Sequence, residues 1–211
     1  ANQSILKDID KVFEFFETNY QIFKYKHIIT SPHYTQKALF NLIETEIYNV
    51  KSGKPGYIKV KMNSITSYNM VDKLYEASNA GVKIQMIVRG ICCLIPGIKG
   101  MSENIEVISI VDKFLEHSRL YVFGNNDNPK VYISSADWMT RNIENRVEVS
   151  CPIYDENIKK ELLDTFEISW NDNVKARILN ESQNNEYRKN NKEEIRSQLA
   201  IYDYYLKKLN N

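Results

Sequence analysis

Five charged residues stand at the ends of expected strands or together on one strand face: Arg89, His117, Arg119, Arg146 and Glu148. Side chains alternate along a strand, so His117 and Arg119 share a face of HSRLYVF. Arg146 and Glu148 share a face of NRVEV, whose valines are directed into the core. An imidazole can act as acid, base or nucleophile near neutral pH, guanidinium groups bind phosphate oxygens bidentately, and a carboxylate can orient an imidazole. The set predicts phosphoryl chemistry.

Each of these residues has a plainer explanation when it is taken singly. A histidine at a strand start is more often a hydrogen-bonded structural residue than a catalyst. Arg-x-Glu on a strand is usually a solvated ion pair, and Arg89 alone is compatible with a surface charge. The other histidines, His27 and His33, lie in an unpatterned segment without acidic neighbours at ligand spacing, so we expect structural or surface roles for both.

The elements that must position these residues follow from the hydrophobic pattern. YIKVKM (57–62) alternates as a strand, residues 68–79 form a helix closed by Ala80-Gly81, and VKIQMIVR (82–89) is the next strand. A strand, a crossover helix and a second strand predict parallel pairing with a right-handed crossover. The glycine-containing loop after Arg89 lies where α/β proteins tend to bind ligands.

The remaining pattern completes an α/β fold. Short strands are expected at 105–110, 118–123, 130–135 and 145–151, and further helices at 5–19, 35–53, 156–171 and 195–209. Together they predict a mixed sheet of about five to seven strands flanked by helices. The polar residues 180–194 are expected to form a mobile linker.

Composition limits the classes of function. A hydrophobic content of 43% over 211 residues favours one domain with a full core, and a net charge of +1 argues against a polybasic protein that binds nucleic acid or membrane surfaces. Any anion site must therefore be local. Three cysteines without zinc spacing, and no apolar run of membrane-spanning length, predict a cytoplasmic protein. A start at Ala1 without methionine suggests a piece of a longer chain.

Several motifs occur together and in order: RGICCL, GxxGxSENI, FLEHSR and SSADWMTRN. From about Leu6 to Leu179 the sequence closely resembles the C-terminal, second catalytic domain of bacterial polyphosphate kinase, a member of the phospholipase D superfamily. The resemblance implies a phospholipase D-like domain at 21–180, preceded by a connecting helix at 1–20 and followed by a polar linker and C-terminal helix at 181–211.

The resemblance implies an enzyme that reversibly transfers the ATP γ-phosphate to polyphosphate through a phosphohistidine. In this family that histidine lies in the preceding domain, within a KxHxK-like motif that is followed by GTGNYN, and neither motif occurs here. The chain alone is therefore expected to be inactive. Its expected partners are ATP or ADP, polyphosphate, the preceding domains of the same polypeptide and further copies in a homo-oligomer, but not nucleic acid. Peripheral attachment of the parent enzyme to the inner membrane stays open.

The resemblance also suggests roles for individual residues. Arg89 and His117 would contact nucleotide phosphates, and His117 could serve as general acid to the leaving ADP. Glu148 would orient His117. Further phosphate ligands would be Arg119, Arg146, Lys61, Ser134, Ser135 and Arg141. Mg²⁺ would arrive with ATP, because no acidic cluster that would hold it is found in the sequence.

Two alternatives remain open. The superfamily pattern is His-x-Lys followed by Gly-Ser-x-Asn, whereas this chain has Arg119 in place of the lysine and Ser134-Ser135-Ala136-Asp137 in place of the second motif. These substitutions argue against a phosphodiesterase or nuclease completed by dimerisation, which is the first alternative. The second is a polyanion-binding module without catalytic activity.

Overall fold

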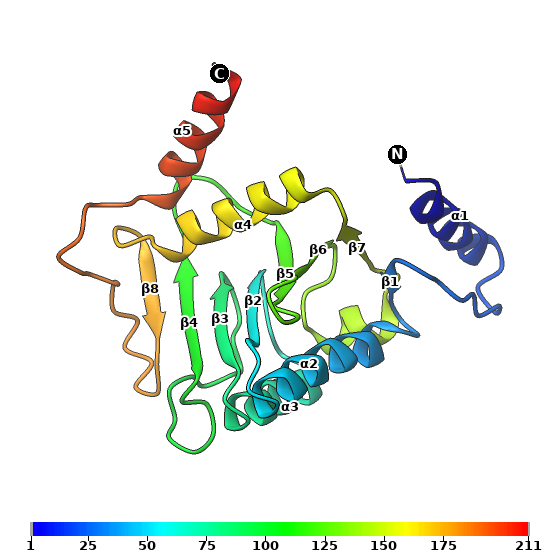
Figure 1. Ribbon diagram of the computed structural model, residues 1–211, viewed down its shortest axis with the longest axis horizontal. Helices are drawn as coiled ribbons and strands as arrows, with labels where there is room; N and C mark the ends of the chain where they lie inside the picture. Colours follow the sequence, from blue (N-terminus) through cyan, green and yellow to red (C-terminus); the bar gives the residue numbers. More distant parts are fainter. Residues whose placement is uncertain (1, 211) are drawn as a thin grey trace.

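The computed structural model describes residues 2–210, and its central feature is an eight-stranded mixed sheet (Figure 1). The strands lie in the order β1-β7-β6-β5-β2-β3-β4-β8. Their bounds are β1 Ile29–Thr30, β2 Tyr57–Met62, β3 Lys83–Val88, β4 Ile105–Ile110, β5 Arg119–Phe123, β6 Lys130–Ser134, β7 Val149–Ile153 and β8 Ala176–Leu179. The helices are α1 Gln3–Glu17, α2 Thr35–Lys51, α3 Tyr68–Asn79, α4 Glu156–Trp170, α5 Ser197–Leu209 and the π-helix η1 Arg141–Asn145.

The middle of the sheet is parallel, and it is extended by antiparallel strands on both sides. β2, β3 and β4 run in one direction, with α3 as the crossover between β2 and β3. β5 pairs antiparallel with β2, β6 with β5, and β8 with β4. The carboxyl ends of β2 and β3 therefore meet the start of β5 and the end of β6 at one edge of the sheet.

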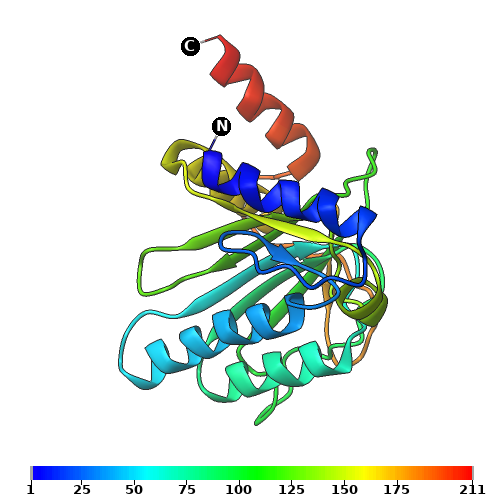
Figure 2. The same ribbon diagram turned by 90° about the vertical axis from the view of Figure 1, so that its right-hand side faces the viewer.

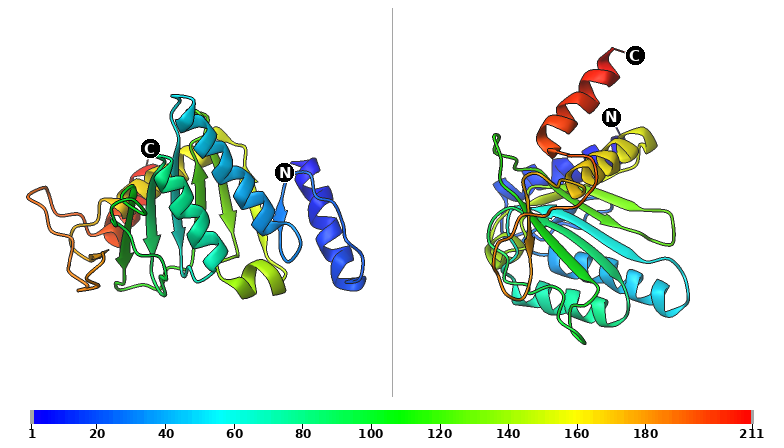
Figure 3. Two further views of the ribbon diagram at one scale, coloured as in Figure 1. Left: turned by 90° about the horizontal axis from the view of Figure 1, so that it is seen from below. Right: turned by 90° about the vertical axis from the view of Figure 1, so that its left-hand side faces the viewer.

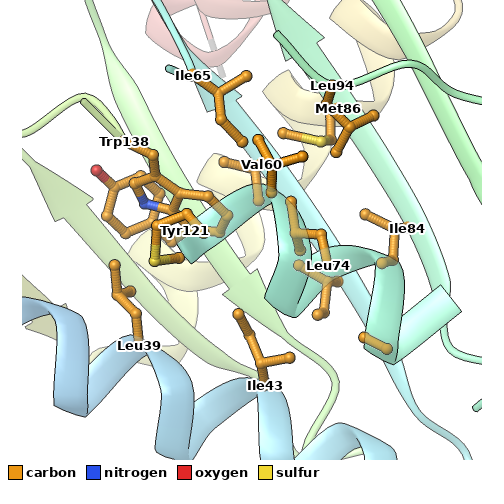
Figure 4. Close-up of a cluster of buried hydrophobic side chains, with 14 of the residues drawn as sticks. Leu39, Ile43, Val60, Ile65, Leu74, Ile84, Met86, Leu94, Tyr121 and Trp138 are labelled. Carbon is orange, nitrogen blue, oxygen red and sulfur yellow. The ribbon is translucent and has the colours of Figure 1, made fainter. Parts of the chain in front are cut away.

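Helices cover both faces of the sheet. α2 and α3 lie side by side on one face, whereas α4, with α5 beyond it, lies on the other (Figures 2 and 3). The larger apolar core fills the space between the sheet and α2 and α3, where Ile43 and Leu74 meet Val60 of β2 (Figure 4). A smaller core lies beneath α4 around Phe166. Alternation along the strands thus directs one set of side chains to each core.

α1 lies beyond the β1 edge of the sheet (Figure 1). The buried carboxylate of Asp8 accepts hydrogen bonds from the backbone N–H groups of Lys26 (2.8 Å) and His27 (2.6 Å), so α1 is tied to the segment that leads into β1. None of the helices within residues 2–210 is both long and apolar enough to cross a membrane.

The mixed α/β fold is confirmed, and β2, α3 and β4 have the predicted bounds. The described sheet has eight strands rather than five to seven. β1 and β8 account for the excess: they contain two and four residues and are held by pairing with β7 and β4. Such short strands leave little alternation for a sequence pattern to detect.

The predicted strand over 145–151 is wrong at its start. Residues 141–145 form η1, the N–H of Arg146 closes this turn on the carbonyl of Arg141 (2.9 Å), and β7 begins only at Val149. Arg146 and Glu148 therefore do not share a strand face. Arg146 is exposed and Glu148 is buried, while Val147 and Val149 are half-buried and lie outside both apolar cores.

Candidate functional site

A polar cluster lies where the central strands β2 and β3 reach their carboxyl ends. Arg89 follows β3 directly and Asn63 follows β2, while residues 111–118 cross from the end of β4 to the start of β5 (green, at the upper right of Figure 2). Nη1 of Arg89 donates to the carbonyl oxygen of Glu116, and Nη2 donates to Oδ1 of Asn63. Nδ1 of His117 lies 3.4 Å from the same Nη2, and the histidine is exposed. The structure thus brings Arg89 and His117 together.

The charge of Arg89 has no carboxylate partner among residues 2–210. Its three contacts are a backbone carbonyl, a side-chain amide and an imidazole, so they fix the guanidinium without neutralising it. When the neutral imidazole of His117 accepts from Arg89 at Nδ1, its proton is on Nε2. The pair can therefore present one full positive charge and one N–H donor to an anion.

Lys61, the next-to-last residue of β2, lies on the α4 side of this cluster. Its ammonium group contacts the Glu116 carboxylate and lies 3.4 Å from Oγ of Ser169 on α4. Lys61 is therefore a partly buried cation whose charge is offset by Glu116. The same glutamate binds Lys61 through its side chain and Arg89 through its backbone, which links the ends of β2 and β3.

Arg119 forms a buried ion pair beneath His117. Its Nε and Nη2 donate to the two carboxylate oxygens of Asp137 at 3.2 and 3.0 Å, and the two side chains are 11% and 5% exposed. Burial acts to raise the pKa of Asp137, but Arg119 and the N–H groups of Asn63 and Ser64 outweigh it and lower that pKa. Nη1 of Arg119 also donates to the carbonyl of His117 at 2.9 Å. The structure therefore makes Arg119 an internal brace of His117, whereas the sequence predicted a phosphate ligand.

The predicted pairing of Glu148 with His117 is absent from the described residues. Instead, the Glu148 carboxylate accepts from the hydroxyl of Ser135 and from Nδ2 of Asn142 (2.5 Å). The carboxylate is therefore directed to Ser135, which follows β6, and to Asn142 within η1. Glu148 is 9% exposed, and each of its carboxylate oxygens accepts one of these hydrogen bonds.

The other predicted ligands fall into two groups. Ser134, at the end of β6, is engaged internally, because its Oγ lies 2.7 Å from Oγ of Ser150 and accepts from the N–H of Ala136 at 3.0 Å. Arg141 is the first residue of η1 and Arg146 follows its last; both are exposed and make no side-chain hydrogen bond or ion pair with residues 2–210. No direct contact joins either arginine to His117 in that part of the chain.

Two contributors to the cluster, Asn63 and Glu116, were not anticipated from the sequence, and neither was Asn142 as the partner of Glu148. Asn63 carries a detectable signal, since it is the first residue after a strand that ends at the ligand-binding edge. Residues 2–210 contain no group of three or more His, Cys, Asp or Glu side chains that could hold a metal ion. The two carboxylates nearest the cluster, Glu116 and Asp137, are already paired with Lys61 and Arg119.

Known proteins resemble the chain over almost its whole length. Residues 28–198 match the family model described as polyphosphate kinase C-terminal domain 2. Polyphosphate kinase of Vibrio parahaemolyticus is 46% identical over 97% of this chain and 30% of its own length, and that of Escherichia coli K12 is 42% identical over the same shares. The chain thus spans about a third or less of the relatives it matches.

Solved structures agree with this assignment. The crystal structure of polyphosphate kinase from Porphyromonas gingivalis superposes with a TM-score of 0.94 and 42% identity, over 99% of this chain and 32% of that one. Nuc from Salmonella typhimurium, a phospholipase D family member, shares the fold at 16% identity with a TM-score of 0.50, over 72% of this chain and 96% of its own. The chain has a phospholipase D-like fold and belongs to the polyphosphate kinase family, as C-terminal domain 2.

Proposed function

We propose that this chain supplies the phosphate-binding half of a polyphosphate kinase active site. The parent enzyme would transfer the γ-phosphate of ATP reversibly to polyphosphate through a phosphohistidine in the preceding domain of the same polypeptide. One observation carries the proposal: the guanidinium of Arg89 is fixed by neutral groups and lies beside the exposed imidazole of His117. An uncompensated cation next to a proton donor is suited to phosphate oxygens.

The surroundings of the other histidines support a phosphohistidine outside this chain. Nδ1 of His27 lies 2.9 Å from the hydroxyl of Tyr154, and its Nε2 is buried. His33 packs edge-on against Phe15 and Tyr34. Within residues 2–210, neither histidine makes a hydrogen bond to a cationic side chain as His117 does with Arg89.

In the proposed reaction each residue of the cluster has a separate role. Arg89 binds phosphate oxygens of the nucleotide, and His117 gives its Nε2 proton to the oxygen of the leaving ADP. Arg119 holds the backbone of His117, while Lys61, Arg141 and Arg146 are proposed as further cations for the phosphate chain. Ser135 shapes the neighbouring segment through its contact with Glu148, and Ser134 through its contact with Ser150. Mg²⁺ is proposed to enter with ATP as part of that substrate.

The first test measures polyphosphate binding by calorimetry at two salt concentrations. We compare the chain with a double variant, Arg89→Ala plus His117→Ala, and with Lys83→Ala, which removes a cation from the opposite end of β3. Binding should weaken with salt, fall at least tenfold in the double variant, and stay unchanged in Lys83→Ala, because the site is local. Undiminished binding in a folded double variant would refute the proposal.

A second assay tests whether the preceding domain is needed. The chain alone should not synthesise polyphosphate from ATP and Mg²⁺, because it lacks the proposed phosphohistidine. Substantial synthesis by the chain alone would contradict this division of labour. Hydrolysis of a phosphodiester such as bis(p-nitrophenyl) phosphate would instead favour the nuclease alternative.

A further inference from the structure

The loop that carries His117 has no regular secondary structure of its own. Residues 111–118 run from the end of β4 across the ends of β3 and β2 to the start of β5. Three of their apolar side chains are exposed, with Val111 67%, Phe114 57% and Leu115 81% exposed. Apolar burial therefore does not fix this loop, and polar contacts must hold it.

The first turn of α5 provides such contacts. The amide side chain of Gln198 accepts a hydrogen bond from the N–H of Phe114 and donates one to its carbonyl, both at 2.8 Å. Arg196 donates from Nε and Nη2 to the two carboxylate oxygens of Asp112 at 2.8 and 2.6 Å. Gln198 is 8% exposed and the Asp112 side chain 3%, whereas the Arg196 side chain is 35% exposed, so the Gln198 contacts are shielded from water and the ion pair only partly. We call Arg196, Gln198, Asp112 and Phe114 the loop clamp.

The α5 side of the clamp is itself anchored to the body of the domain. The buried carboxylate of Asp172 accepts from the N–H of Ser197 at 2.7 Å, and it also accepts from backbone N–H groups at the start of β8. Oδ1 of Asn173 accepts from the N–H of Ile195 at 2.7 Å. The clamp therefore connects the loop to the junction of α4, β8 and α5 rather than to a free helix end.

In the other half of the loop, the His117 carbonyl is held by Arg119, whereas Glu116 is held by groups that the site would use. Glu116 is bound by Arg89 through its carbonyl and by Lys61 through its carboxylate. If phosphate draws Arg89 and Lys61 toward itself, these two contacts to Glu116 weaken. The clamp is then the anchor that keeps residues 112–114 in place, three residues before His117.

We propose that Gln198 and Arg196 are positioning residues for His117, acting through the loop clamp. This inference rests on the proposed function for its catalytic meaning, but the positioning itself is measurable without it. According to this inference, the start of α5 helps to position the site residues, in addition to the strand ends.

The experiment combines hydrogen exchange, histidine NMR and polyphosphate binding on the 211-residue chain. The variants are Gln198→Ala and Arg196→Ala. Arg196→Lys is the conservative change, because it keeps the positive charge but cannot form the bidentate contact with Asp112. Tyr204→Phe is the matched control, because it removes an α5–α4 hydrogen bond (Tyr204 hydroxyl to Asp164, 3.0 Å) without touching the loop.

In both alanine variants, exchange of the amides at 112–118 should rise at least tenfold and the imidazole signals of His117 should shift. Affinity for polyphosphate should fall about three- to tenfold, whereas Arg196→Lys should recover part of the loss and Tyr204→Phe should match the wild type.

Unchanged exchange at 112–118 in folded variants would overturn the inference, as would a mobile loop with unchanged His117 signals. Unchanged affinity beside a mobile loop would also overturn it. Failure of the wild type itself to bind polyphosphate would sink the proposed function instead, and the exchange and NMR results would still decide the positioning role.

Discussion

At the scale of single residues, two neighbouring arginines are treated in opposite ways. Arg119 is paired with Asp137, and the pair is almost fully buried. Arg89 touches only neutral acceptors, and its contact with His117 faces solvent. A guanidinium that already holds a carboxylate gains little from a phosphate, whereas one held by neutral groups keeps its full attraction for an anion. Arg89 is therefore the cation that we propose for the ligand, whereas Arg119 stabilises the fold through its ion pair with Asp137.

The buried pair gives a prediction about stability. Arg119→Ala and Asp137→Ala should each lower the free energy of unfolding by about 3–5 kcal/mol, because each leaves a buried charge without its partner. The double variant should lose clearly less than the sum of the two. Urea unfolding of the four proteins measures this coupling, with Arg119→Lys as a milder variant if an alanine variant does not fold. Strict additivity would show that the two side chains do not act as a pair.

The sequence identifies some of these residues but not their partners. Arg89 and His117 could be predicted because each lies at a strand end and within a motif. Whether Arg119 binds phosphate or forms an internal ion pair depends on Asp137. That residue is 18 positions later in the sequence, and the pairing of β5 with β6 brings it close to Arg119. The role of Glu148 follows from the resemblance, and spacing along the chain does not reveal that Ser135 and Asn142 contact its carboxylate.

At the scale of elements, Asp172 joins the end of α4, the start of β8 and the start of α5. Burial alone would raise the pKa of its carboxyl group, but hydrogen bonds from Ser197, Lys175 and Ala176 outweigh burial and lower that pKa below 3.8. A carboxyl group whose pKa is lower in the folded state stabilises the fold above its unfolded pKa. That contribution is lost as the pH falls through the folded pKa.

This arrangement predicts the pH dependence of an Asp172→Asn variant. At pH 7 it should be less stable than the wild type by about 1–3 kcal/mol, since the amide cannot accept all the hydrogen bonds that the carboxylate accepts. The difference should shrink as the pH falls below about 4. Chemical unfolding between pH 3 and 7 measures it. Asp203→Asn on the exposed side of α5 controls for the loss of charge, and a difference independent of pH would contradict the prediction.

The elements themselves were largely predictable because most strands and helices show a hydrophobic periodicity in their own sequence. β2, α3 and β4 follow from alternation and from helical spacing. η1 has no such signal, because a five-residue π-helix depends on how the chain returns from β6 to β7. The contact between the start of α5 and residues 112–114 could not be predicted from the sequence either, since it joins positions 84 residues apart.

At the scale of the whole molecule, charge is abundant but balanced. The sequence has 28 Lys and Arg against 27 Asp and Glu, and many cations are paired, such as Lys59 with Glu167 and Lys73 with Glu44. A balance of this kind does not favour general attraction of polyanions through net charge. The positive potential should therefore be concentrated at the strand-end edge around Arg89.

This balance predicts selectivity for polyphosphate over nucleic acid. Labelled polyphosphate bound to the chain should be displaced by unlabelled polyphosphate at least about tenfold more effectively than by single-stranded DNA of equal phosphate content. A local site favours closely spaced phosphates, whereas DNA needs an extended basic track or stacking platform. Fluorescence anisotropy at fixed salt measures the competition, and Arg89→Ala should reduce the selectivity by lowering polyphosphate affinity alone. Equal displacement by DNA would mean that the chain binds polyanions through general charge, and the local site would lose its main support.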